Sequence, residues 1–121
     1  MEKEFIPYEQ ALALKELGFK YVSTIFAYDE AGELYTRSGI PHDFNIRGLL
    51  SAPSFSQAFR WFREKYRLDG KPEYFLNNFY CFIINDMKQD DTSRRLFTEF
   101  PSYEEAELEC LKKLISIIKS K

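Results

Sequence analysis

The sequence predicts an α+β fold in the order α-β-β-α-β-β-α, with a four-stranded antiparallel sheet and the helices packed mainly on one face. Three observations support this prediction. Aromatic residues recur at helical spacing in residues 54–68, residues 102–120 have the full pattern of an amphipathic helix, and two pairs of strand-like runs separate the helices. The length of 121 residues suits a single domain, residues 1–121, with one hydrophobic core.

The first helix is predicted over residues 7–17. Proline is tolerated at the first helical position, and Gly18 can supply the left-handed residue that ends a helix. A β-hairpin should follow, because the runs 21–28 and 33–37 are rich in β-branched and aromatic residues and flank the turn residues 29–32.

Residues 38–53 are the least patterned part of the chain and contain two glycines and two prolines. A segment of this length is either a functional loop or a stretch packed along the sheet. Packing is favoured by its apolar residues, which are Phe44, Ile46, Leu49 and Leu50. His42, the sole histidine, precedes Asp43 and is a candidate general base, although local hydrogen bonding in a loop is the favoured interpretation.

The central helix is predicted over residues 54–68 and is expected to provide the main column of the core. At about 100° per residue, one face carries most of its aromatic side chains, with Trp61 at the edge. The residues of this face are Phe55, Ala58, Phe59, Phe62 and Tyr66.

Three arginines form the candidate interaction surface of the sequence. Arg60, Arg63 and Arg67 follow the spacing i, i+3 and i+7, which gathers planar donors along one helix face. Such a face can bind phosphates or acidic side chains. The alternative is an ordinary solvated face, since Glu64 partly neutralises the row.

The second hairpin is predicted from a strand over residues 74–84 and a second strand over residues 94–100. Residues 69–72, Asp-Gly-Lys-Pro, should interrupt regular secondary structure after the central helix. Within the first strand, the Asn77-Asn78 pair indicates either a late start or a bulge. The polar residues 85–93 should form the loop.

The closing helix is predicted over residues 102–120. Ser102 and Glu105 match a capping box, glutamates are concentrated near the start and lysines near the end. The apolar face that should dock on the core comprises Tyr103, Ala106, Cys110, Leu111, Leu114, Ile117 and Ile118.

The three helix starts suggest a weak internal repeat, residues 7–50 and 54–100, followed by the closing helix. Tyr8, Phe55 and Tyr103 occupy similar positions after a proline and are separated by 47 and 48 residues. The alternative is that any three helices favour similar starting residues, since the two halves match poorly elsewhere.

Three helical segments have distinctive sequences: IPYEQALALKELGF at residues 6–19, AFRWFREKY at 58–66 and YEEAELECLKKLI at 103–115. They resemble a family of short uncharacterised proteins found in anaerobic bacterial genomes and in their phages or prophages. The resemblance covers a little over a third of the chain, and Arg67 stands where the family is expected to have glycine. It implies a phage or mobile-element origin and a small stand-alone domain, and it carries over no catalytic residue.

Composition limits the function classes. A net charge of −2 argues against a protein whose whole surface holds nucleic acid. Cys81 and Cys110 lie in apolar runs and are expected to be buried free thiols in a reducing cytoplasm. We expect a cytoplasmic protein without a membrane segment, because no apolar run reaches the length of a signal peptide or a membrane span.

No motif commits the chain to a catalytic chemistry. The sequence contains no glycine-rich phosphate loop, nucleophile elbow or zinc signature, and Asp86, Asp90 and Asp91 are interpreted as a solvated hairpin end rather than a metal site. We therefore expect neither cofactor nor metal.

The favoured function is a non-enzymatic phage or mobile-element protein that binds another protein, in keeping with its 8 tyrosines. Nucleic-acid binding through the arginine face is the alternative. An enzyme that uses the 38–53 loop is less favoured, and a homodimer formed through a strand edge stays open.

Overall fold

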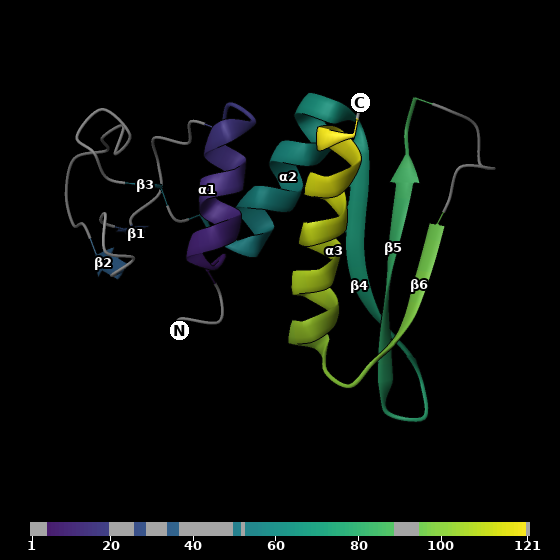
Figure 1. Ribbon diagram of the computed structural model, residues 1–121. Coiled ribbons are helices and arrows are strands. Elements are labelled where there is room, and N and C mark those ends of the chain that lie inside the picture. Colours follow the sequence, from purple (N-terminus) through teal and green to yellow (C-terminus); the bar gives the residue numbers. More distant parts are fainter. Residues whose placement is uncertain are drawn as a thin grey trace. The chain divides into compact units, whose positions relative to one another are not determined.

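The chain is α+β and has three helices in the part that the computed structural model describes (Figure 1). The described residues are 5–19, 26–28, 34–36, 50–51, 53–88 and 95–120. They form two compact units, Met1–Ser56 and Gln57–Lys121, which are described separately below. The single domain over residues 1–121 and the internal repeat stay predictions.

In the first unit, helix α1 (Tyr8–Glu16) confirms the first predicted helix. Gly18 follows it with a φ of 100°, a conformation that glycine adopts without strain. The Gly18 N–H donates to the Lys15 carbonyl at 3.0 Å, and the Phe19 N–H donates to the Leu14 carbonyl at 2.9 Å. This pair of bonds is a Schellman motif, and Leu14 and Phe19, the residues that flank it, are both buried.

The first unit also contains a small antiparallel sheet in the order β2-β1-β3. Strands β1 (Phe26–Tyr28) and β2 (Leu34–Thr36) pair with each other, which confirms the first predicted hairpin for these residues. Strand β3 (Leu50–Ser51) pairs with β1, so the end of the 38–53 segment lies along the sheet as favoured. The rest of that segment, His42 included, lies outside the described residues.

The second unit is built on an antiparallel sheet in the order β4-β5-β6, with α3 packed on one face. Its elements are α2 (Phe55–Tyr66, which begins two residues before the unit), β4 (Leu68–Leu76), β5 (Phe79–Asp86), β6 (Arg95–Phe100) and α3 (Tyr103–Lys119). Strands β5 and β6 form the second predicted hairpin. The single four-stranded sheet is not confirmed, since the described strands belong to two sheets of three strands each.

The prediction that residues 69–72 interrupt regular secondary structure is wrong, because these residues lie within β4. A Cβ added to Gly70 would lie 2.9 Å from the Cys110 Sγ and 3.0 Å from the Leu114 Cδ1, so glycine allows α3 to approach the strand closely. Pro72 is tolerated because β4 is an edge strand, where a missing N–H costs least.

The strand predicted over residues 74–84 begins late, which is one of the two alternatives that the Asn77-Asn78 pair left open: β5 covers Phe79–Asp86, and residues 74–76 belong to β4. Asn77 and Asn78 form the two-residue turn between β4 and β5, with φ angles of 52° and 66°. Positive φ at both central residues defines the type I′ turn that matches the twist of a hairpin, and asparagine tolerates this conformation better than most residues. The hairpin of β4 and β5, which was not predicted, therefore turns at the asparagine pair.

A bulge in β6 brings three phenylalanine rings together. Tyr80 pairs with Phe100 and Phe82 pairs with Phe97, so Thr98 and Glu99 together oppose Cys81. The extra residue places Phe97 and Phe100 on the same face, where their rings stack on Phe82 at centroid distances of 4.6 and 5.5 Å. Glu99 adopts a φ of 74° to make this possible.

Helix α3 is confirmed almost to the residue. The Ser102 side chain accepts a hydrogen bond from the Glu105 N–H at 3.1 Å and so caps the helix. The helix buries Ala106, Cys110, Leu111, Leu114 and Ile115. Both cysteines are buried and free, as predicted, whereas Tyr103, which was expected to be in the core, is exposed.

Helix α2 buries the predicted aromatic face but is shorter than predicted. Phe55, Ala58, Phe59 and Phe62 are buried, and Tyr66 is half-buried. The helix ends at Tyr66 because Arg67 turns into the left-handed region with a φ of 60°, and the Met87 N–H donates to its carbonyl at 2.8 Å.

Candidate interaction surface

The most conspicuous surface feature of the second unit is a group of large apolar side chains at the β4–β5 turn. The exposed fractions are 59% for Tyr74, 46% for Leu76, 43% for Tyr103, 42% for Phe79 and 39% for Phe75. We call these five residues the hairpin tip. Figure 1 shows the β4–β5 turn extending beyond the first turn of α3, which leaves the end of the hairpin uncovered by that helix.

The backbone register distributes the hairpin tip over both faces of the sheet. Tyr74 pairs with Tyr80 on the face that α3 covers, while Leu76 pairs with Phe79 on the opposite face. The register shift between these pairs makes Phe75 the extra residue of a bulge. Apolar surface is therefore presented in two directions from one short hairpin.

A ladder of tyrosines gives the hairpin tip a defined shape. The Tyr74 and Tyr80 rings meet edge to face at a centroid distance of 5.6 Å, and the Tyr80 and Tyr103 rings do so at 6.0 Å. The Tyr74 hydroxyl accepts a hydrogen bond from the Asn78 N–H at 3.3 Å. Rings held in this way lose little conformational entropy when a partner binds.

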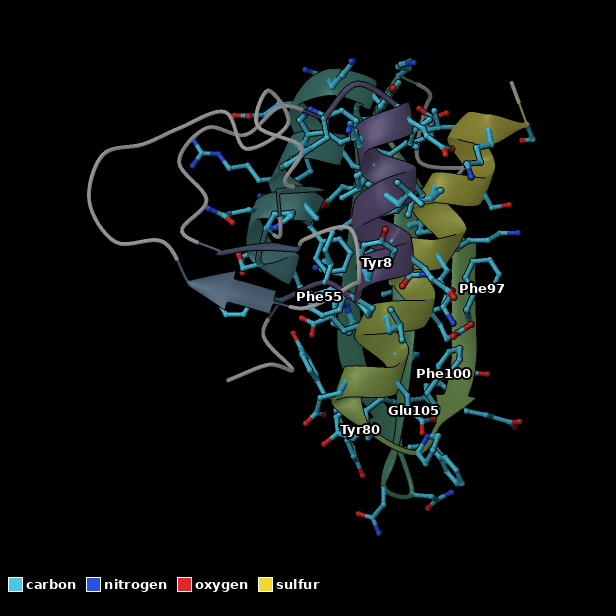
Figure 2. The ribbon with its side chains drawn as sticks, turned by 60° about the vertical axis from the view of Figure 1, so that its left-hand side comes forward. Tyr8, Phe55, Tyr80, Phe97, Phe100 and Glu105 are labelled. Carbon is cyan, nitrogen blue, oxygen red and sulfur yellow. The ribbon has the colours of Figure 1, made fainter. Side chains whose placement is uncertain are left out.

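Four glutamates surround this end of the second unit, and we call them the acidic rim: Glu99, Glu104, Glu105 and Glu107. Figure 2 shows Glu105 on the first turn of α3. Burial, followed by the charge of Glu104, raises the pKa of Glu107 above its ordinary value. Burial, followed by the charges of Glu107, Cys110 and Glu104, likewise raises the pKa of Tyr103, so two of the four carboxylates lie close enough to act on this residue.

The three predicted arginines do not share one helix face. Arg60 pairs with Glu64 on α2 at 3.3 Å, and an Arg63 nitrogen lies 4.0 Å from an Asp69 oxygen on β4. Arg67 lies beyond the end of α2, so its position at i+7 of a continuous helix is wrong. Two of the three guanidinium groups therefore already face carboxylates of the protein.

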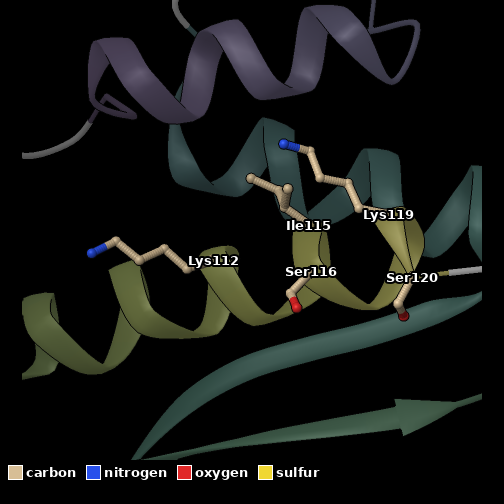
Figure 3. A pocket seen from close by; sticks show the side chains of 5 residues that line it. All are labelled: Lys112, Ile115, Ser116, Lys119 and Ser120. Carbon is tan, nitrogen blue, oxygen red and sulfur yellow. The ribbon is translucent and has the colours of Figure 1, made fainter.

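An open depression of about 440 Å³ is lined by residues of α3. Figure 3 shows these residues, which are Lys112, Ile115, Ser116, Lys119 and Ser120. Lys112 pairs with Glu109 at 3.1 Å, and the Ser120 hydroxyl donates to the Ile117 carbonyl at 2.9 Å. The depression is open and is lined by a single helix, so its shape is not that of an enclosed ligand-binding or active site.

The buried thiol of Cys110 is unsuited to nucleophilic chemistry. Burial, followed by the charges of Asp69 and Glu107, raises its pKa to about 12. The thiol is therefore protonated at neutral pH, and the thiolate is the reactive form.

Of the candidate metal and catalytic residues, the structure describes only Asp86, whose side chain accepts a hydrogen bond from the Lys88 N–H at 3.0 Å. His42, Asp90 and Asp91 lie outside the described residues. Among the residues that are described, no three His, Cys, Asp or Glu side chains converge as a metal site would require. Likewise, no described helix is both long and apolar enough to span a membrane.

Comparisons with protein-family models, curated proteins and solved structures find no match to this chain. The interaction surface must accordingly be judged on its own residues.

Sequence reasoning missed the hairpin tip, although a signal was present. Residues 74–80, Tyr-Phe-Leu-Asn-Asn-Phe-Tyr, place two asparagines between apolar runs. Such a pair marks a hairpin turn, because asparagine accepts positive φ. Interpreting the run as a buried strand hid the exposure of its apolar side chains.

Proposed function

We propose that this protein is a non-enzymatic interaction protein that binds another protein through the hairpin tip. The observation that supports the proposal is the exposure of four large apolar side chains at the end of one hairpin, three of them in succession, and of Tyr103 on the neighbouring helix α3. Exposed apolar residues that occur singly need no explanation, whereas a contiguous group is typical of an interaction site. Tyrosine and phenylalanine are also the residue types enriched at protein interfaces.

The edges of the β4-β5-β6 sheet are less suited to binding than the hairpin tip. Pro72 lacks an N–H in edge strand β4, and the bulge at Glu99 interrupts edge strand β6. Both features discourage a further strand from pairing with an edge. They favour recognition through side chains over a homodimer formed by strand addition.

The phage or mobile-element origin is a further part of the proposal and rests on the resemblance of the three helices. A small chain from such a source would act by binding a host or phage protein. A cytoplasmic site of action is also proposed, and it is supported by the two buried free cysteines, which suit a reducing compartment.

The test is affinity capture from a native host with wild-type protein and a tip variant, Leu76→Ser with Phe79→Ser. These residues face each other across the hairpin and are about half exposed. We expect the wild type to recover a stoichiometric protein partner and the tip variant to lose it, because truncating two interface anchors costs about 2–4 kcal/mol.

A matched control is Met87→Ser, which removes an exposed apolar side chain at the other end of β5. This control should retain the partner. Equal recovery by all three proteins, or recovery of the bare protein alone, would refute the proposal.

Nucleic-acid binding through Arg60, Arg63 and Arg67 is the less favoured alternative, because carboxylates already face two of these residues. A salt titration with a labelled oligonucleotide separates the two functions. Phosphate contacts predict an affinity that falls steeply with salt and weakens when the three arginines are changed to Gln.

A further inference from the structure

We infer that the partner presents a basic and apolar protein segment, with cationic side chains beside the apolar ones that cover the hairpin tip. This inference rests on the proposed function and assigns the chemistry of its occupant. It follows from the juxtaposition of the hairpin tip with the acidic rim on the same end of the second unit.

The charge at this end is of one sign. Residues 72–80 and 97–111 contain six glutamates and neither lysine nor arginine. Of these glutamates, Glu109 pairs with Lys112 and Glu73 lies 3.8 Å from Lys71. The four that remain are the acidic rim, for which no ion pair is recorded among the described residues.

The rim is held beside the apolar surface by contacts within the second unit. The Tyr103 ring meets Tyr80 of the hairpin and is followed directly in sequence by Glu104 and Glu105. Phe100 pairs with Tyr80 across the sheet and is preceded by Glu99. A segment that covers Tyr74 and Tyr103 must therefore approach several carboxylates at the same time.

Charge complementarity selects among the possible occupants. A nucleic acid would place phosphates against the rim, and like charges brought together oppose binding. A second copy that docks tip to tip would bring the two acidic rims together. A lysine- or arginine-bearing segment gains from the carboxylates and can place its cations over exposed tyrosine rings.

The experiment selects ligands from a random twelve-residue peptide display library on wild-type protein. Counter-selection against a Tyr74→Ser/Tyr103→Ser variant, which lacks the two exposed rings on the same face as the first turn of α3, keeps only peptides that need this part of the hairpin tip. We expect the selected peptides to combine lysine or arginine with aromatic or aliphatic residues. A synthetic copy of the strongest peptide then serves as the probe in fluorescence polarisation.

The rim variant for this titration is Glu104→Gln with Glu105→Gln, and the matched control is Glu9→Gln with Glu64→Gln. All four glutamates are exposed, and the control leaves the rim intact. We expect the probe to bind the rim variant about threefold to twentyfold more weakly than wild type, because each exposed ion pair contributes modestly. The control should change the affinity less than twofold.

Each contrary result has a definite meaning. Tip-dependent peptides without a basic preference, or equal affinity for the rim variant, would overturn the inference while the proposed function stands. The absence of any tip-dependent peptide would count against both. If wild type sediments as a dimer and the Leu76→Ser/Phe79→Ser variant as a monomer, a second copy of the chain is the occupant and the inference is overturned. Tip-dependent binding of a labelled single-stranded oligonucleotide would likewise overturn it and assign the hairpin tip to nucleic acid.

Discussion

Gly70→Ala tests how closely α3 packs on β4. The added Cβ would lie 2.9 Å from the Cys110 Sγ and 3.0 Å from the Leu114 Cδ1, both shorter than ordinary van der Waals contact. Cys110 and Leu114 are completely buried, so each must move by about half an ångström within a filled core. Overpacking of this kind costs about 1–3 kcal/mol.

An opposing effect makes the prediction quantitative. Alanine restricts the unfolded chain more than glycine does, which stabilises the folded state by about 0.4–1 kcal/mol. The expected net result for Gly70→Ala is a loss of about 1–2 kcal/mol in the free energy of unfolding. Urea unfolding followed by the fluorescence of Trp61, the sole tryptophan, measures it.

A double-mutant cycle with Cys110→Ala identifies the cause. This second change removes the Sγ that the new methyl group would contact, so the cost of Gly70→Ala should fall by at least half in the Cys110→Ala background. Lys71→Ala, at the exposed neighbouring position, is the control and should change stability by less than about 0.5 kcal/mol. A neutral or stabilising Gly70→Ala, or the same cost in both backgrounds, would refute the packing argument.

Three further predictions concern local features of the second unit. Arg67→Gly should raise the free energy of unfolding by about 0.5–1 kcal/mol, because Arg67 has a φ of 60°; an unchanged urea midpoint would contradict this. Ser102→Ala should lower it by about 1 kcal/mol, since the cap to the Glu105 N–H is lost, and Ser102→Thr should restore most of it. The pKa of Cys110 is raised from 9.0 to about 12, so its contribution to stability should be lost as pH rises from about 9 to 12. The free energy of unfolding measured over this pH range should therefore fall more in wild type than in Cys110→Ala. Parallel curves of stability against pH for the two proteins would contradict the raised pKa of the thiol.

The helices could be predicted from the sequence because their signals are local. Gly18 ends α1 and Ser102 begins α3, and each acts within a few residues of its own position. The buried face of α2 follows from spacing alone. Its end at Tyr66 was missed because an arginine in the left-handed conformation has no sequence signature, although the resemblance had placed glycine there.

The strands were harder to predict because their boundaries depend on distant partners. Gly70 and Pro72 normally interrupt a strand, and they are accepted in β4 only because α3 packs against one and the sheet edge accommodates the other. The bulge at Glu99 serves the rings that stack on Phe82, a contact that no local pattern encodes.

The candidate surface was the least predictable part, because exposure is a property of the assembled unit. Arg60 and Arg63 were singled out for their spacing, yet both lie near carboxylates. Tyr103 was assigned to the core for its place on the apolar face of α3, and it is exposed beside the hairpin.

The most direct test of the account compares stability and binding in the Leu76→Ser/Phe79→Ser variant. If the hairpin tip serves recognition and not folding, the thermal midpoint of unfolding of the variant should stay within a few degrees of that of wild type, while capture of the host partner is lost. A variant that keeps the partner at wild-type recovery, or one that loses it only because it unfolds, would contradict the claim that these exposed apolar side chains form the binding site.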